Sequence, residues 1–127
     1  MSGKRILIID DDLATLHALK KVLQAEGYAV KTAKSATEVL NGVSPNQPDL
    51  ILLDVMIPGL SGYLACQKLK ERFENCPVIM ISGLWQKQDI ERGYWFGADA
   101  YLTKPLDFDA LFESIARLLN PQVENIT

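Results

Sequence analysis

Acidic side chains follow two short apolar runs of this sequence. Three consecutive aspartates, residues 10–12, come directly after residues 5–9, and Asp54 comes after the unbroken apolar run of residues 50–53. Ionised carboxylates within about 4–6 Å of each other raise one another's pKa unless a cation compensates their charge. Mg²⁺ binds through one or two carboxylates together with waters and phosphate oxygens. If the two runs lie side by side, these acids predict a site for Mg²⁺ or Mn²⁺.

A hydroxyl and an ammonium group follow two further apolar runs. Ser82 comes after residues 78–81, and Lys104 follows shortly after residues 100–102. The ammonium group of a lysine pairs well with a carboxylate such as that of Asp54, or with an incoming phosphoryl oxygen. These residue types therefore suit chemistry on a phosphoryl group.

Each of these residues also has an ordinary structural interpretation. Asp12 suits the N-cap of the helical pattern that follows it, and Asp54 would cap a turn. Ser82 would be a turn residue at a strand end, and Lys104 a solvated surface lysine. His17, the only histidine, falls in a helical pattern without a Cys or His partner, so we expect a surface or half-buried helix residue. Separate structural roles do not explain why such residues follow four different apolar runs.

The alternation of apolar runs with helical patterns indicates the fold. Runs without apolar–polar alternation suit strands buried on both faces, and strands that alternate with helices predict a parallel sheet. The expected strands are residues 5–9, 29–33, 50–53, 78–81 and 100–102, and the expected helices are residues 13–26, 35–42, 62–73, 89–96 and 108–119. This pattern predicts an α/β protein with a doubly wound, five-stranded (βα)₅ sheet. In such a sheet, ligands bind at the carboxyl ends of the strands, where the polar residues described above would meet in a pocket open to solvent.

Length and composition suit one globular domain. The chain has 127 residues, 48% of them hydrophobic, and a formal net charge of −3. Basic residues are spread among acids, so direct nucleic-acid binding is not expected. The sequence has no secretory signal and no apolar stretch of roughly 20 residues, the length that spans a bilayer, so we expect a cytoplasmic protein without membrane contact. Cys66 and Cys76 are too few for a metal cage and are expected to be reduced structural thiols.

Four motifs, in their order along the chain, resemble one family. The segments IIDDD, LLDVMIPGLSG, IMISG and ADAYLTKP resemble the receiver domain of two-component response regulators, in particular stand-alone receivers similar to the chemotaxis regulator. The likeness spans about residues 4–119. It implies a flavodoxin-like fold and a single receiver domain over residues 1–127, in which residues 120–127 form a short polar tail.

The resemblance implies a role for each acidic residue. Asp54 corresponds to the phosphoacceptor, and Asp10 and Asp11 correspond to an acidic pair that holds Mg²⁺. Asp11 is the better candidate for a direct ligand, while Asp10 would act partly through water. The backbone carbonyl of Met56 would complete the protein ligands.

The resemblance also assigns roles near the later strands. Ser82 corresponds to a hydroxyl, and Tyr101 to an aromatic side chain, that change position on phosphorylation. Lys104 corresponds to the lysine that pairs with the acceptor or with the phosphoryl group. Receivers usually have a cis peptide bond before the proline that matches Pro105, and an X-Pro bond permits one.

The activity implied by the resemblance is a signalling switch. A phosphoryl group passes to Asp54 from a phosphohistidine on a sensor histidine kinase or a histidine phosphotransfer protein. Phosphorylation then shifts a conformational equilibrium that a downstream protein or an effector domain detects. The chain would catalyse its own Mg²⁺-dependent phosphorylation and dephosphorylation, and would not be a turnover enzyme.

Two positions beside the expected phosphoryl site are apolar. Met56 lies two residues after Asp54, and Leu84 lies two residues after Ser82. In receivers, side chains at these positions border the phosphoryl group and influence attack by water. Neither Met56 nor Leu84 orients a water molecule by hydrogen bonding, so we expect a comparatively long-lived phosphorylated form.

Aromatic residues gather near the expected fourth helix. Tyr94 and Phe96 match positions that are commonly apolar in receivers, so we expect them in the core, whereas Trp95 between them should point elsewhere. Trp85 lies at the mouth of the loop after Ser82. Trp85 and Trp95 are candidates for a partner surface or a homodimer contact on the output face, because tryptophan is enriched at interface hot spots. The alternative is that they are single exposed aromatics, which are common.

Three other functions fit the sequence less well. A receiver can act as a binding module without phosphorylation. A small phosphohydrolase with an aspartyl nucleophile usually requires an acid two residues after the nucleophile, where Met56 stands. A flavin-binding module requires a loop rich in glycine, serine or threonine after the first strand, where residues 10–12 are acids.

Overall fold

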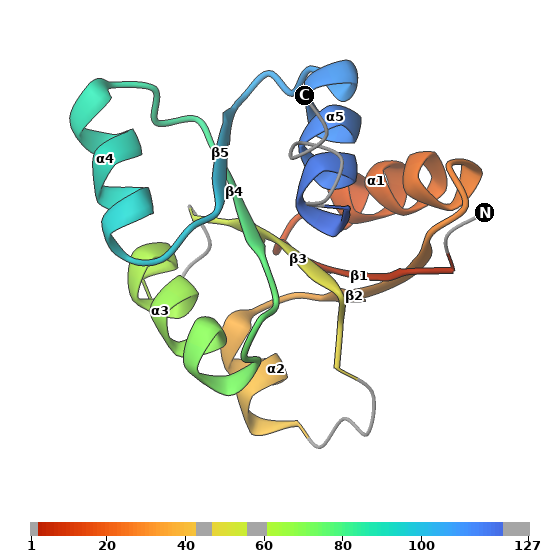
Figure 1. Cartoon of the computed structure of the whole chain (residues 1–127), viewed down its shortest axis with the longest axis horizontal. Helices are drawn as coiled ribbons and strands as arrows, with labels where there is room; N and C mark the ends of the chain where they lie inside the picture. The colour runs from red at the N-terminus through yellow and green to blue at the C-terminus, as the bar shows by residue number, and fades with distance from the viewer. Residues whose placement is uncertain (1–2, 43–46, 56–60, 121–127) are drawn as a thin grey trace.

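The five apolar runs form the strands of one sheet, and helices connect them (Figure 1). The computed structural model describes residues 3–42, 47–55 and 61–120. The strands are β1 Arg5–Ile9, β2 Ala29–Ala33, β3 Leu50–Asp54, β4 Val78–Ser82 and β5 Ala100–Thr103. The helices are α1 Leu13–Ala25, α2 Ala36–Asn41, α3 Gly62–Arg72, α4 Lys87–Trp95 and α5 Phe108–Leu119. Within these described residues, no helix has the length and apolar character needed to cross a membrane.

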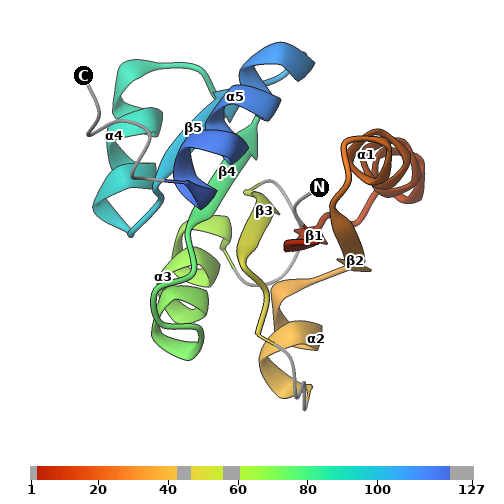
Figure 2. The ribbon, with the colours of Figure 1, turned by 45° about the vertical axis from the view of Figure 1, so that its right-hand side comes forward.

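The sheet is parallel throughout, with the strand order β2-β1-β3-β4-β5. Every residue of β3 and β4 is buried, because helices cover both faces of the sheet. Helices α1 and α5 pack on one face, and α2, α3 and α4 lie on the other (Figures 1 and 2). This arrangement confirms the doubly wound (βα)₅ sheet, and its strand order is that of flavodoxin-like folds.

The register brings the carboxyl ends of four strands to one edge of the sheet. Ile9 of β1 pairs with Leu53 of β3, and Ser82 of β4 pairs with Thr103 of β5. The residues that follow these positions, including Asp54, therefore lie along the same edge. The prediction that the polar residues at the strand ends meet is confirmed at the level of the backbone.

Gly62 lets helix α3 begin against the end of β3. A Cβ atom at this position would collide with the backbone and Cβ of Val55, the residue that follows Asp54. Only glycine fits so close an approach, which fixes the start of α3 beside the acidic edge.

Helix α1 begins where the sequence predicts. The Asp12 carboxylate accepts hydrogen bonds from the backbone N–H of Ala14 at 3.3 Å and from the Thr15 hydroxyl at 2.6 Å. The Thr15 hydroxyl is the main cause that lowers the pKa of Asp12. Asp12 is the N-cap, and His17 lies exposed on the same helix, as expected.

Helix α4 begins at Lys87, two residues before the expected start at residue 89. Asp89 lies inside the first turn, and its carboxylate accepts a hydrogen bond from the backbone N–H of Gln86 at 3.2 Å. A side chain in the first turn that reaches back in this way stabilises a helix start from within. The sequence pattern placed the boundary at the acid itself and therefore began the helix too late.

The prediction that Tyr94 packs in the core is wrong, because 49% of its surface is exposed. Gly93 takes the inward position of α4, and successive helical residues point about 100° apart. Phe96 is half-buried, with its ring centroid 6.0 Å from that of Tyr63. Trp95 points away from the core as expected, with 85% of its surface exposed.

A polar cluster joins α3 to the amino ends of β4 and β5. The Lys70 ammonium group donates to the Asp99 carboxylate at 2.8 Å and to the Cys76 carbonyl at 3.2 Å. The same carboxylate oxygen accepts from the backbone N–H of Val78 at 2.8 Å. This cluster lies at the edge of the sheet opposite the acidic residues, so it stabilises the fold without entering the site.

Cys66 and Cys76 are free thiols buried in the core. Burial raises the pKa of each to about 12, far above neutral pH. Because the thiolate is the reactive form of cysteine, both are inert structural residues, as expected.

Candidate functional site

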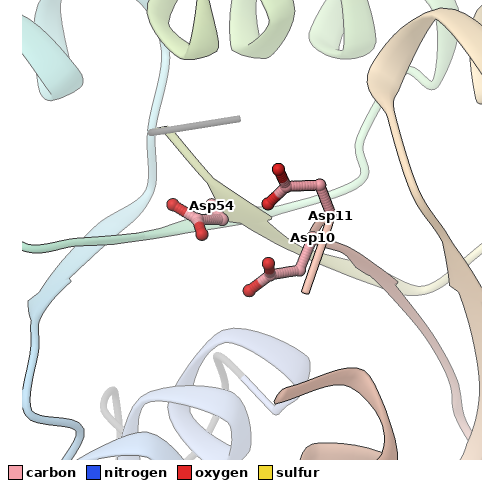
Figure 3. A group of neighbouring side chains, drawn as sticks. All are labelled: Asp10, Asp11 and Asp54. Atoms are coloured by element: carbon pink, nitrogen blue, oxygen red, sulfur yellow. The ribbon is translucent and has the colours of Figure 1, made fainter. Parts of the chain in front are cut away.

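Three carboxylates meet at the carboxyl edge of the sheet (Figure 3). Asp10 and Asp11 follow β1, and Asp54 ends β3. One oxygen from each of these three side chains lies within 4.8 Å of the other two. Asp10 and Asp54 are buried, whereas Asp11 is exposed. The prediction that these acids share one site is confirmed.

Asp10 is held in place by the backbone that follows it. Its Oδ1 accepts a hydrogen bond from the Asp12 N–H at 2.9 Å. Burial first, and then the negative charge of Asp54, raise the pKa of Asp10 to about 6 against the opposing effects of the Asp12 N–H and the Lys104 charge. Folding therefore places Asp10 where ionisation is costly unless more positive charge enters the site.

Among the residues that the structure describes, Lys104 places a positive charge beside the acids. Its Nζ lies 3.0 Å from Oδ2 of Asp54. The Lys104 side chain is 39% exposed and the Asp54 side chain only 7% exposed, so Lys104 lies at the solvent side of the pair and Asp54 lies beneath it. Asp54 is more deeply buried than a pocket open to solvent implies, although it is not sealed off. The predicted pairing of Lys104 with Asp54 is present.

Ser82 and Tyr101 both contact the backbone of Leu84. The Ser82 Oγ accepts a hydrogen bond from the N–H of Leu84 at 2.9 Å. The Tyr101 hydroxyl donates to the carbonyl of the same residue, also at 2.9 Å. Leu84 thus links the hydroxyl at the end of β4 to the aromatic side chain of β5 through its backbone.

The remaining predicted site residues lie around this edge or outside the described residues. The Lys104-Pro105 peptide bond is cis, as the resemblance implies. Trp85 follows Leu84 and is 70% exposed. Met56 lies outside the residues that the structure describes, so its carbonyl remains a predicted ligand.

Two residues near the site were not identified from the sequence. Tyr63 of α3 lies beside the Tyr101 hydroxyl, and Gly93 of α4 packs against the Tyr101 ring. A glycine in the middle of a helical pattern was a usable signal, because glycine lowers helix propensity and is often retained there for close packing. No sequence signal indicated the contact of Tyr63, since it depends on how α3, α4 and β5 pack together.

The carboxylate cluster fits a hard divalent cation. All three side chains offer oxygen donors, which Mg²⁺ prefers, and their oxygens lie within 4.8 Å of one another. Three carboxylates lie near one lysine, so the site keeps an excess of negative charge that a divalent cation would balance. Asp10, Asp11 and Asp54 are therefore the described residues that would hold it.

Comparison with known proteins assigns the family. The family model of the response regulator receiver domain matches residues 6–116. RpaA of Synechocystis sp., a DNA-binding dual master transcriptional regulator, is 41% identical over 117 residues, which cover 91% of this chain and 48% of that protein. The response regulator PleD of Caulobacter vibrioides is 40% identical over 116 residues, which cover 90% of this chain and 26% of that protein. The chain thus spans at most about half the length of these curated relatives.

Solved structures agree with this assignment. A CheY-like receiver domain from Methanospirillum hungatei has a TM-score of 0.86 and 34% sequence identity, covering 98% of this chain and 99% of that one. The BeF3-activated receiver domain of DrrB has a TM-score of 0.83 and 32% identity, covering 92% of this chain and 97% of that one.

Strand order and the acidic edge define an α/β protein of the receiver type. The chain belongs to the response regulator receiver domain family, whose members act in two-component signalling.

The raised pKa of Asp10 predicts a pH-dependent cost in stability. Its value of about 6 exceeds the ordinary value of 3.8, so the folded protein binds this proton more tightly than the unfolded chain. Stability is then lost as the pH rises from 3.8 to 6, and Asp10→Asn removes that loss while it keeps an acceptor for the Asp12 N–H. We expect Asp10→Asn to raise the free energy of unfolding by roughly 2–3 kcal/mol at neutral pH without divalent ions.

Urea unfolding in a chelating buffer, at about pH 7.5 and again below pH 4, measures this effect. The gain should disappear at the lower pH, where Asp10 is protonated in both states. Asp109→Asn, at an exposed aspartate, is the matched control and should show no such pH-dependent gain. An Asp10→Asn protein that is no more stable than the wild type at neutral pH would contradict the prediction.

Proposed function

We propose that this chain accepts a phosphoryl group from a phosphohistidine donor onto Asp54, and that the resulting change near Ser82 and Tyr101 is its output. The observation that carries this proposal is the position of Asp54. It lies 3.0 Å from the Lys104 ammonium group and shares a cluster of carboxylates with Asp10 and Asp11.

The chemistry follows from the groups around Asp54. A carboxylate oxygen of Asp54 attacks phosphorus while the bond between phosphorus and the histidine nitrogen breaks; the electron pair stays on the imidazole, and the product is an acyl phosphate. Charge spreads over the transferring oxygens, so catalysis is mainly positioning and electrostatic stabilisation. Lys104 supplies one fixed positive charge for this purpose. Mg²⁺, when bound to the three carboxylates, would supply the remaining positive charge.

The output begins at Ser82. In the described structure its oxygen accepts from the Leu84 N–H, and its own hydrogen is the group we expect to donate to a phosphoryl oxygen. A shift of Ser82 would move Leu84, whose carbonyl accepts the hydrogen bond from the Tyr101 hydroxyl. Phosphorylation would thereby shift populations of α4, β5 and α5. This is a switch that acts once per phosphorylation, not a turnover enzyme.

The partners follow from the same chemistry. The phosphoryl donor is a sensor histidine kinase or a histidine phosphotransfer protein, and we propose that the exchange takes place in the cytoplasm. Because the chain spans about half of RpaA and about a quarter of PleD, the output partner is either a separate protein or an effector domain. RpaA is named as DNA-binding, whereas we expect this chain itself to bind no nucleic acid and no membrane.

Incubation with acetyl phosphate and Mg²⁺ tests the proposed function. Intact mass spectrometry should detect one added phosphoryl group, which is lost in Asp54→Asn and retained in the matched control Asp109→Asn. Lys104→Ala should slow the reaction by roughly 10²-fold or more, the usual effect of removing one group that stabilises developing charge.

Other results would select other functions. A wild-type chain that stays unmodified, but still binds a histidine kinase, would indicate a phosphorylation-independent binding module. Continued release of phosphate from many substrates would indicate a phosphohydrolase. Either result contradicts the proposed switch.

The apolar side chains at positions 56 and 84 predict slow dephosphorylation. Neither Met56 nor Leu84 orients a hydrolytic water, so replacement of each by asparagine should speed phosphate loss by up to about tenfold, the rate change given by about one hydrogen bond. Loss of radioactive phosphate from the phosphorylated protein measures this. Rapid loss from the wild type that barely changes in Met56→Asn and Leu84→Asn would contradict the prediction.

Trp95 is proposed as a homodimer contact on the output face. It lies at the end of α4 with 85% of its surface exposed, and burial of so large an apolar side chain favours association. We expect Trp95→Gln to weaken self-association of the phosphorylated protein by at least about tenfold, which corresponds to about 1.4 kcal/mol.

Sedimentation equilibrium measures this association, with Leu13→Gln, at the 53% exposed first residue of α1, as the control that should associate as the wild type does. Unchanged self-association of Trp95→Gln would show that Trp95 is not part of the interface.

A further inference from the structure

Helix α4 is held to the body of the protein in an unusual way. The one fully buried residue of this described helix is Gly93, which has no side chain to pack. Tyr94 and Trp95, which follow it, are exposed. The apolar side chain of Ile90 in α4 is only half-buried, so groups that reach α4 from neighbouring elements supply much of its anchoring.

The first of these groups is the ring of Tyr101. A Cβ atom at Gly93 would lie 2.7 Å from Cδ2 and 3.0 Å from Cε2 of this ring, and 3.0 Å from Sδ of Met80. These separations are shorter than carbon atoms adopt in contact. The glycine therefore forms a notch in α4 that the Tyr101 ring occupies.

The second group is the side chain of Tyr63 in α3. Its hydroxyl faces the Asp89 carbonyl in the first turn of α4, at a hydrogen-bond distance of 3.4 Å. Its ring lies 6.0 Å from that of Phe96, and the Arg92 guanidinium carbon lies 5.5 Å from its centre. Burial, followed by the adjacent Tyr101 hydroxyl, raises the pKa of Tyr63 to about 12, so it stays a protonated donor at neutral pH.

The two tyrosines act on the same short segment. Tyr101 donates to the carbonyl of Leu84 at 2.9 Å, and Tyr63 faces the carbonyl of Asp89 at 3.4 Å. Between these two carbonyls the chain passes from the end of the β4–α4 loop into α4. The Ser82 oxygen accepts a hydrogen bond from the N–H of Leu84, the same residue whose carbonyl contacts Tyr101. A side chain that fixes Tyr101 therefore also restrains Leu84, the residue that contacts Ser82.

We propose that Tyr63 and Gly93 are positioning residues of the switch, which hold Tyr101 against α4 before any phosphoryl group is bound. The proposal rests on the proposed function of Ser82 and Tyr101 and deepens it. Tyr101 then need not turn inward on phosphorylation, because it is already in place. The phosphorylated state reuses this arrangement, so loosening it lowers the affinity of the site for a phosphoryl group or its analogue.

Thermal unfolding of four proteins tests the notch. In the wild-type background Gly93→Ala should lower the melting temperature by a few degrees, because its methyl group collides with the Tyr101 ring. In a Tyr101→Ala background the same substitution should raise the melting temperature, because alanine favours a helix over glycine. This reversal of sign distinguishes a specific notch from general packing of α4.

Calorimetric titration with beryllofluoride, an analogue of the phosphoryl group, tests the coupling. With saturating Mg²⁺, Tyr63→Phe removes only the hydroxyl and should weaken beryllofluoride binding by roughly 3–10-fold, the size expected from one hydrogen bond. The affinity for Mg²⁺ alone should not change. Tyr28→Phe, at a partly buried tyrosine that packs against the core on the opposite face of the sheet, is the matched control and should bind beryllofluoride as the wild type does.

Either of two results would overturn the proposal: a Gly93→Ala effect of the same sign in both backgrounds, or unchanged beryllofluoride binding by Tyr63→Phe. A wild-type protein that binds no beryllofluoride with Mg²⁺ would instead overturn the proposed function. The melting temperatures would then still decide whether Gly93 acts through the Tyr101 ring, because they do not depend on phosphoryl chemistry.

Discussion

Crowding of negative charge at the ends of β1 and β3 is the constraint on which the site depends. Asp10, Asp11 and Asp54 bring oxygens within 4.8 Å of one another, and burial makes the ionisation of Asp10 costly. Lys104 offsets only part of this charge. A parallel sheet that is covered on both faces holds the strand ends in place despite this unfavourable charge. The result is a cluster of oxygen donors whose chemistry fits a divalent cation.

The same edge of the sheet connects this site to helix α4. Ser82 and Tyr101 both contact the backbone of Leu84, and the Tyr101 ring fills the notch at Gly93 in α4. Helix α4 contributes no large buried side chain of its own, so its position depends on these contacts. Weak anchoring of this kind suits an element that moves between two arrangements.

The sequence predicted the architecture and the residues of the site because both depend on local patterns. Short apolar runs identified the strands, and an acid, a hydroxyl or a lysine after four of them marked the edge where they meet. Other contacts depend on packing between distant segments and left no local signal: Tyr63 with Tyr101, and Lys70 with Asp99, 29 residues apart. The orientation of Tyr94 was missed because Gly93 was not identified as the buried residue of α4.

We propose that the three carboxylates form one divalent metal site. Anomalous X-ray scattering from a crystal soaked in Mn²⁺, a stand-in for Mg²⁺ with a stronger signal, tests this directly. One strong peak is expected among the carboxylate oxygens of Asp10, Asp11 and Asp54. A crystal that shows bound Mn²⁺ elsewhere on the protein, and no peak between these three side chains, would contradict it.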